Sequence, residues 1–141
     1  MNRIRPIAIC VFLKNNRILV FEGHDQIKSE TFYRPLGGGI EFGESGIAAV
    51  RREIMEELHS GIDELKHLGN LENIFVHDGK MGHEIIMVYD GALRESGLYD
   101  QAVIDVVEAN GEKVRAMWKS LDEFAEGKSI LYPDGLLEML S

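Results

Sequence analysis

The chain has 141 residues and carries 24 acidic against 15 basic side chains, a formal net charge of −9 at pH 7. This length suits one folded domain with a substantial apolar core, and we expect a single domain over residues 1–141. The excess of acid argues against a DNA-binding or RNA-binding protein, because affinity for the phosphate backbone depends on lysine and arginine. A small anionic substrate remains compatible with the charge if a metal cation mediates the contact.

The only cysteine, Cys10, excludes an internal disulfide and a cysteine-based zinc site. It lies in the apolar run 7–13, which is far shorter than the ~20 residues that span a bilayer. Arg3 and Arg5 precede this run as in a signal peptide, but a polar segment follows it in place of a small-residue cleavage site. We therefore expect a buried strand, no membrane partner and a cytoplasmic location.

Most of the chain has the pattern of short strands separated by turns, and about six or seven strands are predicted. The predicted strands are 6–13, 18–21, 32–34, 71–77, 84–93, 103–108 and 113–118. Turns or loops are predicted at Asn15-Asn16, at the glycines 37–39, at Asp78-Gly79-Lys80 and at Asn110-Gly111.

One long helix is predicted over residues 45–58, where Ser45 suits the N-cap. Its apolar residues recur at three- and four-residue spacing and are Ile47, Val50, Ile54 and Leu58. Two short helices follow near the end of the chain. The first begins at the capping-box pattern of Ser120 and Glu123, and the second is opened by Pro133.

Three glutamates on the long helix form the most informative feature of the sequence. Glu53, Glu56 and Glu57 fall within about 100° of the helix circumference, since each residue turns the helix by about 100°. Like charges at this spacing repel one another, so the helix gains no stability from them. Hard oxygen donors of this kind bind Mg²⁺ or Mn²⁺, although many glutamate-rich helix faces are simply solvated.

The segment from Gly38 resembles the signature of the Nudix hydrolase family, G-x5-E-x7-R-E-U-x-E-E-x-G-U, where U is a bulky aliphatic residue. The matching residues are Gly38, Glu44, Arg52, Glu53, Ile54, Glu56 and Glu57. His59 and Ser60 replace the last glycine and the closing aliphatic residue, which concerns only the helix end and its exit loop. We expect His59 to be a C-terminal helix residue that favours the helix dipole.

The resemblance extends over residues 5–140, because the segments FYRPLGGGIEFGES and AMWKSLDEF are also similar to those of the family. It implies an α/β fold, a Nudix-type α/β/α sandwich with a central mixed β-sheet. It also implies hydrolysis of a diphosphate linkage in a nucleoside diphosphate derivative by water and a divalent metal, Mg²⁺ or Mn²⁺. That substrate is a nucleoside triphosphate, a nucleotide sugar or a dinucleoside polyphosphate.

The resemblance assigns roles to individual residues. Glu53, Glu56 and Glu57 match the metal-ligating glutamates, and the carbonyl of Gly37, beside Gly38, is a further expected ligand. Glu44 is expected to steady the loop or to add to the outer metal shell. Arg52, four residues before Glu56, is expected to orient that carboxylate through a salt bridge.

The catalytic base has more than one candidate. Glu53 is the candidate inside the motif, while Glu112 and Glu108 are candidates in the late hairpin. The assigned catalytic set is Glu53, Glu56, Arg52 and Glu112. Glu108 and Glu112 are equally typical of solvated hairpin carboxylates.

Recognition of the substrate is less defined by the sequence. Some strand aromatics could stack on a base, although such residues more often belong to a core, and they are Phe32, Tyr33, Phe75 and Tyr89. Arg34 is a candidate phosphate contact. Polar residues expected to border the pocket are His77, Asp78, Lys80 and His83, and His24-Asp25 is expected in a loop.

Two alternatives to small-molecule hydrolysis remain open. One is a nucleotide-binding regulatory module without turnover, against which the complete glutamate set argues. The other is an RNA 5′-end pyrophosphohydrolase, against which the charge of −9 argues. The resemblance also allows a homodimer, since many relatives pair.

Overall fold

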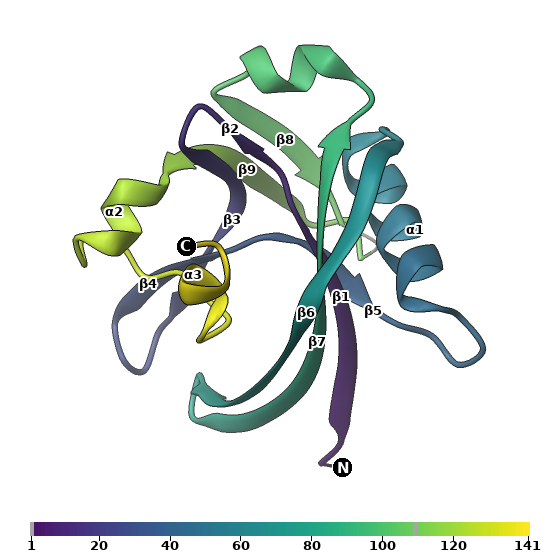
Figure 1. The fold of residues 1–141 in the computed structure, drawn as a ribbon. Coiled ribbons are helices and arrows are strands. Elements are labelled where there is room, and N and C mark those ends of the chain that lie inside the picture. Colours follow the sequence, from purple (N-terminus) through teal and green to yellow (C-terminus); the bar gives the residue numbers. More distant parts are fainter. Residues whose placement is uncertain (1, 109) are drawn as a thin grey trace.

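The computed structural model describes residues 2–108 and 110–141 and shows two β-sheets with helices on both sides (Figure 1). The first sheet, called the mixed sheet, has the strand order β5-β1-β7-β6. Its strands are β1 (Ile4–Val11), β5 (Leu36–Gly39), β6 (Ile62–His77) and β7 (Lys80–Leu93). β1 and β7 are parallel, whereas the other neighbours in this sheet are antiparallel.

The second sheet, called the antiparallel sheet, is built around β3 and β9. Its strands are β2 (Leu13–Lys14), β3 (Arg17–Asp25), β4 (Glu30–Arg34), β8 (Val103–Val107) and β9 (Lys113–Ser120). The chain passes from the mixed sheet to this one at Phe12, whose side chain is fully buried. Asn15 and Asn16 then reverse the chain with φ angles of 53° and 61°, which confirms the predicted turn.

The helices form the outer layers. α1 (Gly46–Leu58) lies on one side, where Ala49, Val50 and Ile54 pack in a core with residues of both sheets. On the other side α2 (Leu121–Ala125) and α3 (Leu136–Met139) contribute Phe124 and Leu136 to a second core. The predicted α/β/α sandwich with a mixed sheet is therefore confirmed.

The expected loop over residues 37–39 is wrong, because these glycines form most of strand β5 and pair with β1. A Cβ on Gly37 would collide with the backbone carbonyl of Ala8, and the φ angle of Gly37 is 147°. Glycine is required here by the close approach of two backbones. The absence of a side chain, which makes glycine common in loops, thus also permits a tightly packed strand.

The prediction for α1 is confirmed in its extent and its cap, since the side chain of Ser45 accepts a hydrogen bond from the backbone N–H of Ala48. Its apolar stripe is only partly correct. Val50, Ile54 and Leu58 are buried, but Ile47 is 51% exposed because it lies in the first turn at the margin of the buried arc. Glu57 lies near the centre of that arc instead.

The remaining elements extend or shorten the predicted ones. β6 and β7 form a much longer hairpin than expected, with Asp78 and Gly79 at its turn. A 3-10 helix, η1 (Ser96–Asp100), was not predicted. The loop that holds Asn110-Gly111 runs from Glu108 to Glu112, longer than a two-residue turn, and residue 109 within it lies outside the described residues.

The second predicted helix begins as expected, because Ser120 caps α2 by accepting from the N–H of Asp122. The third is shorter than expected, since α3 starts three residues after Pro133. No helix among the described residues combines the length and apolar character that crossing a membrane requires.

Candidate active site

Arg52 organises the charged face of α1. Its guanidinium donates two hydrogen bonds to Glu44, at 2.8 and 2.9 Å, and one to the carbonyl of Gly39 at 3.0 Å. Nη1 donates to Glu53 at 2.9 Å and lies 3.5 Å from Glu56. The predicted Arg52–Glu56 pair therefore exists, but the two-pronged contact with Glu44 is the stronger one.

Glu44 is fixed in the loop before α1. It also accepts a hydrogen bond from the backbone N–H of Glu41 at 3.2 Å. The hydrogen bonds from Arg52, followed by that from Glu41, lower the pKa of Glu44 to about 2. The geometry therefore supports the loop-steadying role expected of Glu44.

Glu57 is the unusual carboxylate of the group, because its residue is only 8% exposed. Burial raises its pKa to about 8, and the charges of Glu53 and Glu108 act in the same direction. The charge of Arg34 and a hydrogen bond from the backbone N–H of Gly37 oppose this rise. Glu57 Oε1 has no hydrogen-bond partner among the residues that the structure describes.

A divalent cation fits these residues. A buried carboxylate oxygen without a hydrogen-bond partner is costly. Such an oxygen would serve as a ligand of a bound cation, whose charge would also offset the repulsion between Glu57 and Glu53. Glu53 lies on the preceding turn of α1, where its charge acts on Glu57, and Glu56 is half exposed beside Arg52. The donors are all hard oxygens, which Mg²⁺ and Mn²⁺ prefer.

The second glycine of β5 makes room for Glu53. A Cβ on Gly38 would collide with the Glu53 carboxylate, so this side chain lies directly against the strand. Next to it, the backbone N–H of Gly37 lies near enough to Glu57 to oppose the rise of its pKa. Gly37 and Gly38 therefore bring the backbone of β5 against two of the three helix glutamates.

The late hairpin contributes to the site through Glu108. Glu108 is half buried, and its charge contributes to the raised pKa of Glu57. Glu112 is exposed in the same loop, where its carbonyl accepts from the N–H of Glu108 at 2.8 Å. The structure thus brings Glu108 toward the helix carboxylates and records no such interaction for Glu112.

The residues that depart from the motif are accommodated at the end of α1. His59 is the C-cap residue in the left-handed conformation, with φ 54° and ψ 39°, which explains why a glycine suits this position. Ser60 is buried, donates to the carbonyl of Gly61 at 2.8 Å and accepts from the N–H of Glu95 at 3.1 Å. Both replacements therefore affect the helix exit and leave the carboxylates in place.

The strand aromatics mostly pack within the protein. Tyr89 is buried, Tyr33 packs edge-on against Phe124, and the ring of Phe75 lies across Gly82. Phe32 contacts the rings of His77 and Tyr132 at centroid distances of 5.7 and 5.2 Å. Arg34 is exposed at the end of β4, and its charge reaches Glu57.

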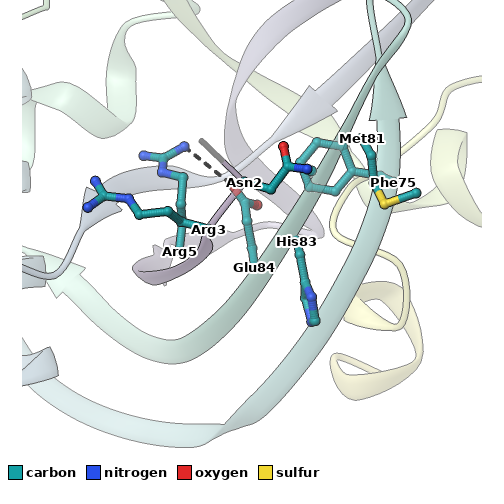
Figure 2. A pocket seen from close by; sticks show the side chains of 8 residues that line it. Asn2, Arg3, Arg5, Phe75, Met81, His83 and Glu84 are labelled. Atoms are coloured by element: carbon teal, nitrogen blue, oxygen red, sulfur yellow. Dashed lines mark hydrogen bonds and ion pairs between the residues drawn. The ribbon is translucent and has the colours of Figure 1, made fainter.

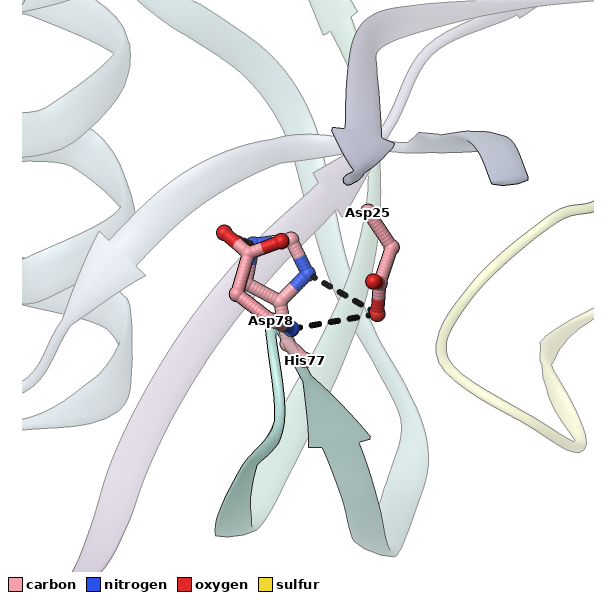
Figure 3. A group of neighbouring side chains, drawn as sticks. All are labelled: Asp25, His77 and Asp78. Atoms are coloured by element: carbon pink, nitrogen blue, oxygen red, sulfur yellow. Dashed lines mark hydrogen bonds and ion pairs between the residues drawn. The ribbon is translucent and has the colours of Figure 1, made fainter. Parts of the chain in front are cut away.

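A second polar group, Asp25, His77 and Asp78, was expected only as separate loop residues (Figure 3). Three of their ligand atoms lie within 4.8 Å of one another, the only such group among the described residues. The buried carboxylate of Asp25 already accepts from the N–H groups of Ile27, Lys28 and Asp78, at 3.0, 3.0 and 3.1 Å. These bonds join two hairpin turns that are distant in sequence.

Comparison with known proteins agrees with this fold. The family model described as "NUDIX domain" matches residues 3–136. A NUDIX hydrolase from Nitrosomonas europaea has a similar structure, with a TM-score of 0.65 and 16% identity over 98% of this chain and 86% of that one. A MutT NUDIX hydrolase from Burkholderia pseudomallei has a TM-score of 0.56 and 21% identity, covering 86% of each chain.

A MutT protein from Bacillus halodurans is also similar, with a TM-score of 0.57 and 17% identity over 87% of this chain and 72% of that one. At these identities the structural likeness shows the fold. The family model covers nearly the whole chain, and its match includes every residue of the motif. This chain therefore belongs to the Nudix family.

Proposed function

We propose that this protein hydrolyses the diphosphate linkage of a nucleoside diphosphate derivative with the help of Mg²⁺ or Mn²⁺. The observation that carries the proposal is Glu57 in a motif typical of the family, because its buried Oε1 has no hydrogen-bond partner within residues 2–108 and 110–141. Such an oxygen is explained by a cation that neutralises it.

Glu53, Glu56 and Glu57 would hold the metal, with the carbonyl of Gly37 as a further ligand. When bound, the cation would neutralise the phosphate oxygens and lower the pKa of a ligated water. Arg52 keeps Glu53 and Glu56 oriented, while Glu44 fixes Arg52 from the other side. This arrangement fixes the orientation of Glu53 and Glu56 before the substrate arrives.

We assign Glu53 as the proton acceptor for the attacking water. Water adds to phosphorus, its proton passes to Glu53, and the bridging P–O bond breaks with the leaving phosphate retaining the electron pair. Glu112 and Glu108 stay alternatives from the hairpin, and the geometry favours Glu108 because its charge reaches Glu57.

Arg34 is the proposed contact for a substrate phosphate. It is exposed beside Glu57, and the structure records no ion pair for it among the described residues. The single cysteine is buried and unpaired, as suits the reducing cytoplasm in which we place the protein. The substrate is a nucleoside triphosphate, a nucleotide sugar or a dinucleoside polyphosphate.

The test is a chromatographic assay for the nucleotide products formed with Mg²⁺ and Mn²⁺ from these three substrate classes and from a triphosphorylated RNA. We expect turnover of at least one class, and Glu57→Gln should lower kcat by about 10²-fold or more, since it removes a ligand charge. The matched control is Glu41→Gln, an exposed acid of the preceding loop, which should retain wild-type turnover.

Other outcomes would contradict the proposal. Tight nucleotide binding without cleavage of any substrate in the presence of Mg²⁺ or Mn²⁺ would indicate a regulatory module. Turnover confined to triphosphorylated RNA would indicate an RNA-end hydrolase instead. Equal loss of activity in Glu57→Gln and Glu41→Gln would show that the measured effect is not specific to the metal site.

A further inference from the structure

Two arginines share a cavity at the beginning of this acidic chain. Arg3 precedes β1 and Arg5 lies within it, and both line a cavity of about 240 Å³ (Figure 2). Phe75 of β6 and Glu84 of β7 line it as well. We call this cavity the arginine pocket. The chain as a whole carries a net charge of −9, so two guanidinium groups in one cavity make a local region that attracts anions.

Both arginines lie on the face of the mixed sheet that is opposite to α1. Arg5 pairs with Glu84 in the parallel ladder, and Arg3, two residues earlier, lines the same cavity. Side chains alternate along a strand, so Ile7 shares the face of Arg5. Ile7 packs in the core that contains Leu136 of α3, whereas the core of α1 lies on the other face.

Most of the hydrogen-bonding capacity of the two guanidinium groups is unused. Nη1 of Arg5 lies 3.5 Å from Glu84 Oε2, a long contact, and the Arg5 side chain is 63% exposed. For Arg3 the structure records no ion pair within residues 2–108 and 110–141. A guanidinium has several donors in a planar fork that matches two oxygens of a phosphate group. The arginine pocket can therefore bind a phosphate without breaking a strong pair.

The arginine pocket adjoins the candidate active site across one strand. Nη2 of Arg5 lies 3.9 Å from the position that a Cβ on Gly39 would take. The carbonyl of Gly39 accepts from Arg52 at 3.0 Å, and Arg52 donates to Glu53 at 2.9 Å. β1 is the neighbour of β5, so their backbones are about one strand spacing, ~4.8 Å, apart. Because β5 is an edge strand, its two faces are connected around its free side.

This separation matches a phosphate chain that is longer than a diphosphate. Hydrolysis requires the two phosphates of the cleaved linkage at the cation and the helix carboxylates. A third phosphate extends beyond them, and its charge is repelled by the acidic face of α1. Arg5 and Arg3 offer positive charge one strand away. A nucleotide sugar has only two phosphates and would leave the arginines without an anionic partner.

We propose that Arg3 and Arg5 form a subsite for a phosphate beyond the cleaved linkage. The substrate is then a nucleoside triphosphate or a dinucleoside polyphosphate, in preference to a nucleotide sugar. This inference rests on the proposed function, because it names the substrate class of the same site. Glu84 positions the Arg5 guanidinium at the pocket through the contact at 3.5 Å.

Kinetic selectivity tests the proposal. The wild-type kcat/KM with Mg²⁺ should be about tenfold or more higher for a nucleoside triphosphate or a dinucleoside tetraphosphate than for a nucleotide sugar. Arg5→Gln should reduce this preference about tenfold, mainly through KM for the phosphate-rich substrate, because a charge-assisted contact is lost. The matched control is Arg115→Gln on β9, whose side chain is 76% exposed, and it should keep the preference.

Binding of inorganic phosphate chains gives a readout that does not need turnover. In isothermal titration calorimetry with Mg²⁺, the wild-type protein should bind tripolyphosphate at least about tenfold more tightly than pyrophosphate. Arg5→Gln and Arg3→Gln should each narrow this difference, and Arg115→Gln should not. Circular dichroism checks the fold of every variant, and Arg3→Gln takes the place of Arg5→Gln if the latter fails to fold.

The outcomes separate this inference from the proposed function. Turnover that favours nucleotide sugars, or a preference that Arg5→Gln leaves unchanged, would overturn the subsite and leave the hydrolase in place. Equal effects of Arg5→Gln and Arg115→Gln would also overturn it, since net charge would then explain them. Tighter binding of tripolyphosphate that depends on Arg5, without turnover of any substrate, would support the subsite and contradict the proposed function. The faster of the two phosphate-rich substrates identifies which class supplies the phosphate.

Discussion

At the scale of single residues, Arg52 holds the candidate site together. One guanidinium contacts three carboxylates, from Glu44, Glu53 and Glu56, and the carbonyl of Gly39. The planar fork of arginine provides several donors in fixed directions, whereas lysine offers one compact charge. A motif that requires arginine at this position is therefore explained by geometry as well as by charge.

Arg52→Lys should disturb the site without unfolding the protein. We expect the pKa of Glu44 to rise from about 2 toward its usual 4.5, because the two-pronged contact is lost. We also expect kcat to fall about 10–100-fold with little change in KM, since catalytic carboxylates lose their orientation. Carboxyl NMR titration measures the first effect and steady-state kinetics the second.

Arg52→Lys should also change how much stability the protein loses in acid, and the direction of this change can be predicted. The folded pKa of Glu44 is lowered, so its contribution to stability is present above pH 4.5 and is lost as the pH falls toward about 2. The wild-type protein should therefore lose more stability over this range than Arg52→Lys. Arg51→Lys is the control, because Arg51 makes a single bond to the carbonyl of Ile62. An unchanged pKa of Glu44 in Arg52→Lys would show that the two-pronged contact with Arg52 is not what lowers this pKa.

At the scale of elements, strand β5 combines two functions in adjacent glycines. Gly37 allows the close approach to β1, and Gly38 leaves the space that Glu53 occupies. Gly39, by contrast, has no atom nearer than 3.9 Å to the position of an added Cβ. The three glycines therefore differ in what a methyl group would displace.

Gly38→Ala should impair activity by pushing the Glu53 carboxylate away from β5. We expect kcat to fall at least about tenfold, because a displacement of about 1 Å is costly at a catalytic centre. Gly39→Ala, the control, should keep wild-type kinetics, since its methyl group would make only ordinary van der Waals contacts. Kinetic assays and thermal melts of both variants make the comparison. Equal kinetics of the two variants would contradict the placement of Glu53.

Local patterns predicted α1 and its Ser45 cap, because apolar spacing and capping act within a few residues. The same patterns predicted a loop in place of β5, because glycines are common both in loops and in strands that approach a neighbour closely. Only the tertiary contact with β1 decides between the two. The helix glutamates were predicted as a group. The place of Glu57 beside the apolar stripe predicts a position at the core boundary, but its nearly complete burial depends on the sheets packed against α1.

At the scale of the whole molecule, Asp25 links two distant hairpins. Its carboxylate accepts from Ile27 and Lys28 in its own turn and from the N–H of Asp78 in the turn between β6 and β7. Asp78 in return accepts from the N–H of Gln26 at 2.9 Å. The two sheets are thus joined at the tips of their hairpins, a contact that sequence spacing does not reveal.

Asp25→Asn should lower the melting temperature by about 5 °C at pH 7, because one end of the amide would then face backbone N–H donors. Asp78→Asn is the matched control and should change the melting temperature by only about 1 °C, since asparagine keeps the acceptor and tolerates the φ angle of 50°.

The backbone N–H of Lys28, followed by those of Asp78 and Ile27, lowers the pKa of Asp25 below 3.8. The stability that Asp25 contributes is therefore present above pH 3.8 and is lost as the pH falls through the lowered value. The difference between wild type and Asp25→Asn should narrow in acid, because protonated Asp25 also carries a donor where an acceptor is needed. A difference that stays constant from pH 7 into this acid range would show that the charge of Asp25 does not stabilise the joined hairpins.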